Sequence, residues 1–288
     1  MHGSSSPAWD AHYPDPQRLR HETICMAESV VEVLLDEIPR GEIRGVYLKG
    51  SAHREWDSPI DYVPEMSDVD IHIEFYGDAV WRRYMGTVPQ AIGIQREVEI
   101  RYFSKVSQPV HIPRPQLIIV NKLMHEVDFV HSPRRTVQVL YGEEYPLADY
   151  GDPDRIRRAE CNRLLEAAVY LGDFPLHVID RPGKYVGESL RPLAWRVSPA
   201  GPRVLHISGV GTETAWSLSR TKVVSVLAEL GQLELATRYT EYYLFGWEYF
   251  LSRYEAADHG RSAIAAGVGV LTKAAEVASD WLAGHPGN

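Results

Sequence analysis

The chain has 288 residues, which is enough for two domains with a substantial buried core. It carries 39 acidic and 30 basic residues, and the formal net charge of −9 argues against a long nucleic acid as its main partner. No apolar run is long enough to span a membrane, and the polar start Met1–Pro7 lacks the apolar core of a secretory signal. We therefore expect a cytoplasmic protein without a membrane partner.

The first elements in chain order are predicted as a tail, a helix and two strands. Residues 1–14 are expected to be disordered. A helix is predicted from Asp15 to about Ile38, with Asp15 as N-cap and Pro16 at the first helical position. Apolar strands are predicted at Ile43–Leu48 and Val69–Phe75.

Two acidic residues mark the start of the second strand. Because side chains alternate along a strand, Asp68 and Asp70 project to one face and Val69 to the other. Adjacent carboxylates repel each other unless a cation lies between them, and Mg²⁺ prefers such oxygen ligands together with substrate phosphates. At the end of the first strand, Gly50 would let the backbone approach a phosphate closely, and Ser51 adds a hydroxyl and an N–H donor.

A short helix is predicted over Asp78–Met85 and a third strand over Val98–Phe103. In such a strand Glu97 and Glu99 share one face, while apolar Val98 and its neighbours point the other way. The two acids are therefore either part of a site or the solvated face of an edge strand.

The order of these motifs resembles the nucleotidyltransferase superfamily of DNA polymerase β type, especially its antibiotic-modifying (aminoglycoside and lincosamide) and minimal branch. The resemblance is carried by Gly50-Ser51 after an apolar strand and by Asp68-Val69-Asp70 on the next, and it fades after Gly142. It implies an α/β (α+β) fold in which a mixed sheet with flanking helices is followed by a C-terminal helical bundle. The expected domains are a catalytic domain over residues 15–150 and a mainly helical substrate-binding domain over residues 151–288.

The resemblance also implies an activity. The enzyme would move a nucleoside monophosphate from an NTP, with ATP the first candidate, to a hydroxyl of a small molecule and release pyrophosphate. Two Mg²⁺ ions, with Mn²⁺ as a substitute, would be the cofactor. The alternatives are nucleotidylation of a macromolecule (a tRNA end or a partner protein, as in toxin–antitoxin relatives) and a nucleotide-binding relative that has lost catalysis. A homodimer is one option for the assembly.

Site roles follow from the same resemblance. Asp68 and Asp70 would be the catalytic metal ligands, and Glu99, with Glu97 as the alternative, the third ligand or the general base. Gly50 and Ser51 would bind the phosphates. Lys222 is either a triphosphate contact or an ordinary surface lysine, and Lys49 receives no role. The long loop of residues 52–67 is expected to fold rather than to be flexible.

The rest of the chain is predicted to be mainly helical. The segment from Leu117 to Val127 is interpreted as a helix, and a helix from Pro153 to Leu171 is expected to be capped by Asp152. A hairpin is predicted between residues 193–197 and 203–207. An aromatic-rich helical region is predicted from residue 215 to 254, broken near Gly231, with its aromatic side chains in the core. An Ala-rich helix over residues 262–282 follows. Cys25 and Cys161 are expected to be free buried thiols.

Overall fold

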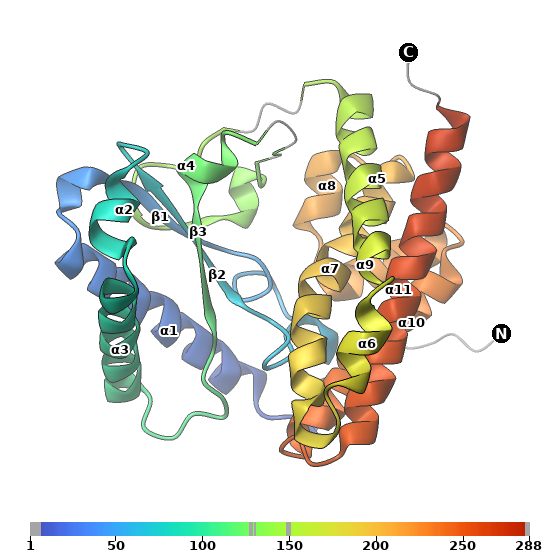
Figure 1. The fold of residues 1–288 in the computed structure, drawn as a ribbon, viewed down its shortest axis with the longest axis horizontal. Coiled ribbons are helices and arrows are strands. Elements are labelled where there is room, and N and C mark those ends of the chain that lie inside the picture. Colours follow the sequence, from blue (N-terminus) through green and yellow to red (C-terminus); the bar gives the residue numbers. More distant parts are fainter. Residues whose placement is uncertain (1–6, 127–128, 130, 148–150, 286–288) are drawn as a thin grey trace. The chain divides into compact units, whose positions relative to one another are not determined.

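The computed structural model describes residues 7–126, 129, 131–147 and 151–285, and in this part the chain is a mixed α/β protein (Figure 1). The described strands are β1 (Ile43–Lys49), β2 (Val69–Phe75), β3 (Pro115–Ile119) and β4 (Gln138–Gly142). The helices are α1 (Pro16–Glu37), α2 (Val80–Met85), α3 (Val88–Lys105), α4 (Val120–Leu123), α5 (Pro153–Tyr170), α6 (Phe174–Ile179), α7 (Val186–Ile207), α8 (Thr212–Ser217), α9 (Arg220–Glu229), α10 (Leu233–Leu251) and α11 (Ala257–Gly284).

The chain divides into two compact units. The sheet unit comprises Trp9–Glu55 and Ser67–Asp149, and the helical unit comprises Met1–Ala8, Trp56–Met66 and Tyr150–Asn288. Of the expected N-terminal tail, residues 1–6 lie outside the described part, and a turn closes between Asp10 and Tyr13. The long loop between β1 and β2 thus belongs for most of its length to the helical unit, whereas the sequence had placed it in a domain of residues 15–150.

The sheet unit is built on four strands in the order β3-β2-β1-β4. Strands β1 and β2 are antiparallel, β1 and β4 are antiparallel, and β2 and β3 are parallel. Helix α1 packs against this sheet. Asp15 caps α1 by accepting a hydrogen bond from the Gln17 N–H at 3.0 Å, so the predicted helix and its cap are confirmed, as are the predicted first two strands.

The predicted third strand is wrong. Residues 98–103 lie in α3, which begins after a capping box in which Thr87 and Gln90 exchange hydrogen bonds and Pro89 occupies the first turn. Val98 and Tyr102 are the buried residues of α3, and a spacing of four is the helical period. The alternation of apolar residues over this short stretch is therefore accidental.

The third strand of the sheet is β3, in a segment predicted to be a helix. The predicted helix at Leu117–Val127 is wrong over the residues of β3 and correct only for the single turn of α4; Val127 lies outside the described part. Pro115 opens β3 in register with Val69 of β2. The apolar run of the segment was too short to distinguish a buried strand from a helix.

The helical unit is formed mainly by α5, α7, α10 and α11, which pack on one another. The structure confirms the predicted helix at residues 153–171 with its Asp152 cap, and it confirms the final helix. The predicted break is also present: α9 and α10 are separated at Gly231, where φ is +79°. The predicted hairpin is wrong because residues 186–207 form α7 with three prolines inside it. The aromatic side chains of α10 are core, as expected; those with less than 4% exposure are Tyr239, Tyr242, Tyr243, Trp247 and Tyr249.

The segment Trp56–Met66 is fastened to α9 and α10 within the helical unit. Its single 3-10 turn, Pro59–Asp61, receives a hydrogen bond from the Trp247 indole N–H at 2.8 Å to the Pro59 carbonyl. The buried Arg220 guanidinium donates to the carbonyl of Ile60 at 3.0 Å. The predicted folded excursion is therefore a structured part of the helical unit.

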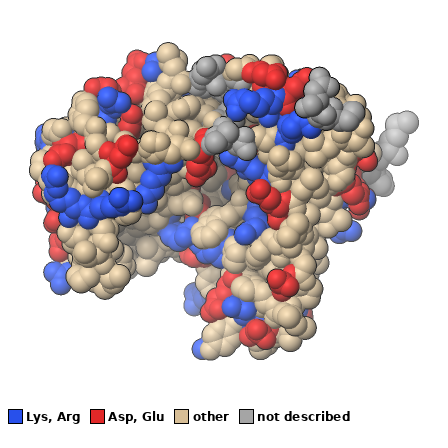
Figure 2. Space-filling view, turned by 45° about the horizontal axis from the view of Figure 1, so that its top comes forward, with Lys and Arg blue, Asp and Glu red and all other residues tan. Residues whose placement is uncertain are grey.

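On the face drawn in Figure 2, Lys and Arg residues are interspersed with Asp and Glu. In the described residues, no helix combines the length and apolar character needed to cross a membrane. Cys25 and Cys161 are free and buried, as predicted.

Candidate functional site

The turn after β1 brings the backbone close to the acidic strand. Gly50 has φ +76°, a conformation that favours glycine, and its carbonyl accepts hydrogen bonds from the N–H groups of His53 and Arg54 at 3.2 Å. A Cβ at Gly50 would overlap the carboxylate of Asp70. Position 50 therefore requires glycine for two reasons: the positive φ of the turn, and the close approach of the Asp70 side chain.

The two aspartates lie at the start of β2: Asp70 is within the strand, and Asp68 directly precedes it. Asp68 is 9% exposed and Asp70 is half-buried. Residues of β2 that alternate with them, Val69 and Ile71, are fully buried on the opposite face. The predicted closeness of Gly50 and Asp70 is thus present in the structure, and the contacts of Asp68 are those with Arg114.

Arg114 neutralises Asp68. Its Nε donates to Oδ1 at 2.9 Å and its Nη2 donates to Oδ2 at 2.6 Å, a bidentate ion pair. The Arg114 carbonyl also accepts from the Val69 N–H at 2.9 Å, so the residue that leads into β3 is fixed beside the start of β2. The Arg114 guanidinium therefore occupies the side of the Asp68 carboxylate at which a metal ion would bind.

Asp70 lies in a row of three residues that crosses three strands. Lys49 of β1 and Gln116 of β3 are its register partners on either side, and register partners project to the same face. Lys49 donates from Nζ to the Ser132 hydroxyl at 2.9 Å. Burial lowers the pKa of Lys49, and Asp70 partly offsets this effect.

Behind this row the polar face continues into a buried cluster. His72 is 1% exposed, and its Nδ1 lies 3.1 Å from the hydroxyl of Tyr145. Burial, with the nearby Lys49 charge, lowers the pKa of His72 to about 2, so the imidazole is neutral. Burial raises the pKa of Tyr145, which keeps its hydroxyl protonated and able to donate to Nδ1. His72 and Tyr145 thus form a neutral, buried hydrogen-bonded pair at the strand that carries Asp70.

Three cations lie near the turn after Gly50, together with the carboxylates of Glu55 and Asp70. The Arg20 guanidinium, from α1, donates to the carbonyls of His53 and Arg54. The Arg54 charge is close enough to lower the pKa of Lys49. With these three cations near Gly50 and Ser51, the turn suits the binding of a phosphate group.

The predicted third acid loses its structural basis. Glu97 and Glu99 are two residues apart on a helix, so they point in different directions and do not share a strand face. The Glu99 carboxylate accepts from Gln95, and the Glu97 carboxylate pairs with Arg96 at 3.4 Å; these contacts lie within α3.

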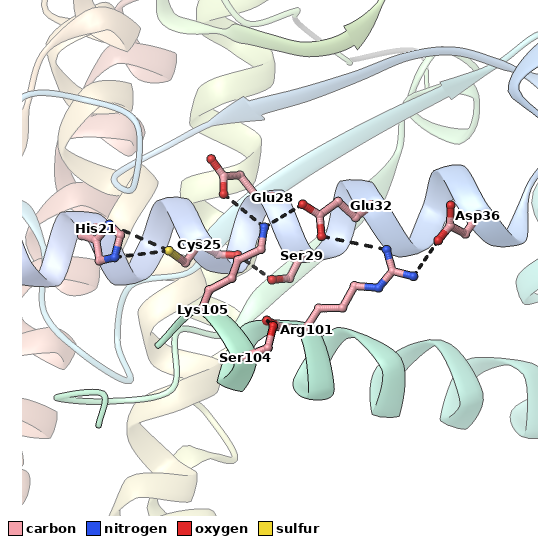
Figure 3. A network of polar contacts seen from close by, with 9 residues as sticks. All are labelled: His21, Cys25, Glu28, Ser29, Glu32, Asp36, Arg101, Ser104 and Lys105. Atoms are coloured by element: carbon pink, nitrogen blue, oxygen red, sulfur yellow. Dashed lines mark hydrogen bonds and ion pairs between the residues drawn. The ribbon is translucent and has the colours of Figure 1, made fainter. Parts of the chain in front are cut away.

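Ion pairs fix α3 on α1 rather than on the sheet. Figure 3 shows Lys105 between Glu28 and Glu32 of α1, at 3.2 and 2.7 Å, and Arg101 between Glu32 and Asp36. None of these contacts involves Glu97 or Glu99.

Lys222 belongs to the helical unit. It lies in the first turn of α9, where its Nζ is 3.5 Å from a carboxylate oxygen of Asp57, and its side chain is half exposed. Asp57 also accepts from the Ser219 hydroxyl at 2.9 Å. Within its own unit Lys222 is thus a surface lysine with an acidic neighbour.

The residues of the polar face suit one hard cation better than a pair. Asp68 and Asp70 supply two carboxylates and Gln116 a neutral amide oxygen, which together with phosphate oxygens and water match the ligands of Mg²⁺. Among the described residues, no three His, Cys, Asp or Glu side chains are grouped so that they could hold a metal ion.

Sequence reasoning did not identify three residues of this site. Arg114 and Gln116 precede the segment from Leu117 for which the sequence predicts a helix, so they are not expected to lie in a strand. Lys49 has no predicted role because nothing in the sequence shows which strands lie on either side of Asp70. The available signal was Pro115 followed by a short apolar run, which is typical of an edge strand.

Comparisons with models of known families, with curated proteins and with solved structures give no match to this chain.

Proposed function

We propose that the protein is a nucleotidyltransferase that moves a nucleoside monophosphate from an NTP to a hydroxyl of a small molecule. The observation that carries the proposal is the contact between the Gly50 turn and Asp70. It places a backbone turn that suits a phosphate directly beside Asp70, one of the two carboxylates that would hold Mg²⁺.

In this proposal each residue has a separate role. The Gly50 backbone and Ser51 hold the β- and γ-phosphates, and Asp68 and Asp70 hold the divalent ion, which when bound neutralises the charge of the triphosphate. The bond between the acceptor oxygen and the α-phosphorus forms as the bond to pyrophosphate breaks, and the hydroxyl proton passes to water. Positioning and charge neutralisation provide most of the catalysis of such a transfer.

A second candidate is a nucleotide-binding protein without transfer. The ion pair between Arg114 and Asp68 favours it, since a carboxylate that is already neutralised attracts a metal less strongly. Gln116 in the row with Asp70 favours it too, because an amide adds no negative charge. Both candidates bind nucleotide, and only the first releases pyrophosphate.

The test begins with binding. We expect one of ATP, GTP, CTP and UTP to raise the melting temperature in a Mg²⁺-dependent way, and Asp70→Asn to lose this shift while remaining folded. Pyrophosphate release is then measured with hydroxylated small molecules, a small RNA and the purified chain itself as acceptors. A shift without pyrophosphate release from any acceptor would favour the second candidate, and absence of a shift for all four nucleotides would contradict both.

A further inference from the structure

We propose, on the basis of the proposed function, that the site uses a single divalent ion and that Lys49 supplies the second positive charge to the triphosphate.

The supply of carboxylates limits the number of ions. Two metal ions about 4 Å apart require carboxylates that bridge them and further ligands that complete each shell. On the polar face at the start of β2, the described residues offer Asp68 and Asp70, and both oxygens of Asp68 already accept from Arg114. A second ion would have to bind with hardly any negative charge from the protein.

Gln116 is the residue of β3 that lies directly beside Asp70. It is the register partner of Asp70 on the neighbouring parallel strand, so its side chain starts beside that of Asp70 on the same face. Its amide oxygen can ligate an ion, but it cannot offset the charge of another one. With glutamine rather than an acid at this position, the site has negative charge for only one ion.

Lys49 provides a positive charge on the opposite side of Asp70. It is the register partner of Asp70 on β1, and its chain neighbour is Gly50, whose turn we assign to the phosphates. The hydrogen bond from Nζ to Ser132 uses one of three N–H donors of the ammonium. An ammonium on this side of Asp70 can face phosphate oxygens while the ion lies toward Asp68.

The inference is tested by counting bound ions with a nucleotide that cannot react. The α,β-methylene analogues of ATP, GTP, CTP and UTP are tried in turn for Mn²⁺-dependent binding to the whole chain by calorimetry, with Asp70→Asn as the control that should not bind. The analogue that binds is mixed with protein at one equivalent, and free Mn²⁺ is measured by electron paramagnetic resonance during a titration.

The expected count is one Mn²⁺ per complex in the wild type and two in Gln116→Glu. Two ions in the wild type would overturn the inference while the proposed function stands. A count of one in both proteins would overturn the role given to Gln116. If no analogue binds in the presence of Mn²⁺, the proposed function fails, and this inference with it.

The role of Lys49 has its own measurement. Lys49→Met keeps the length of the side chain and removes the charge, so we expect it to weaken Mn²⁺-analogue binding at least tenfold with the ion count unchanged. Lys49→Arg should recover most of the affinity. Equal affinity in the wild type and Lys49→Met, with both proteins folded by circular dichroism, would show that Lys49 serves only as a neighbour of Asp70.

Discussion

Arg114 holds both carboxylate oxygens of Asp68 in a bidentate ion pair, with distances of 2.9 and 2.6 Å. The side chain of Asp68 is 9% exposed and that of Arg114 is 36% exposed, so the arginine can leave while the aspartate stays in place. A divalent ion that binds Asp68 has to compete with this guanidinium.

The first prediction follows from that competition. Arg114→Gln should lower the Mg²⁺ concentration at which nucleotide-dependent stabilisation is half complete by roughly fivefold, which corresponds to about 1 kcal/mol for a partly exposed ion pair. Thermal shift over a Mg²⁺ series measures it, and Arg96→Gln, an exposed arginine of α3, is the control. An unchanged or higher Mg²⁺ requirement would mean that Arg114 positions Asp68 for the metal.

The second prediction concerns the acids of α3. Because Glu97 and Glu99 lie on a helix that is fixed to α1, we expect Glu97→Gln and Glu99→Gln to keep pyrophosphate release within about twofold of the wild type, a range typical of surface changes. Asp70→Asn should abolish it. A large loss of pyrophosphate release in either glutamine variant would show that the replaced glutamate contributes to the site.

The third prediction concerns Gly50. Gly50→Ala forces a side chain into a left-handed conformation and into contact with Asp70, so we expect the free energy of unfolding to fall by about 1–3 kcal/mol and nucleotide binding to be lost. Urea denaturation measures the first effect. Gly93→Ala is the matched control, because it lies inside α3 with open space around it and should gain about 0.5–1 kcal/mol.

The fourth prediction is a pH dependence set by His72. Its pKa is about 2 in the folded chain and near 6.5 in the unfolded chain, so only the unfolded state gains this proton as the pH falls below 6.5. The free energy of unfolding should therefore decrease with falling pH, and His72 should account for about 2 kcal/mol of the loss by pH 5. His72→Gln should reduce the difference in stability between pH 7 and pH 5 by that amount.

Tyr145→Phe separates this effect from the loss of a hydrogen bond. It removes the partner of His72 Nδ1 and leaves the imidazole in place, so stability should fall at both pH values while the dependence on pH persists. If His72→Gln and the wild type lose the same stability between pH 7 and pH 5, His72 is not the group responsible.

The fifth prediction concerns the loop between β1 and β2. Asp61 is 2% exposed and accepts three hydrogen bonds: from the N–H of Ser58 at 3.0 Å, and from the N–H and hydroxyl of Thr221 at 2.9 and 2.7 Å. Asp61→Ala leaves these donors without an acceptor and should cost about 2–4 kcal/mol in urea denaturation. Asp57→Ala, at an exposed position, should cost under about 1 kcal/mol.

The elements that the sequence predicted correctly are those with local signals. Asp15 followed by Pro16 starts α1, and the apolar strands on either side of Gly50 and Asp68 are long enough to identify. Local signals failed where tertiary context decides, as in α7, which continues through three prolines.

For the site, the sequence located the carboxylate pair and the glycine turn but not their neighbours. The neighbour of Asp70 on β3 depends on which distant segment forms that strand. No short sequence pattern predicts the order of strands in a sheet, so Gln116 could not be identified. The alternating pattern of residues 98–103 favours a strand beside Glu97, but a window that short fits both the strand and the helix period.

The membership of Trp56–Met66 in the helical unit also determines how the chain can be divided. Neither unit is one continuous stretch of sequence, so a gene fragment that stops near residue 150 would lack the α9 and α10 residues that hold Pro59, Ile60 and Asp61. A fragment that starts there would lack the segment itself. Truncations and domain exchanges at that boundary should give insoluble products, and a clean separation of the two units requires residues 56–66 to be replaced by a short linker.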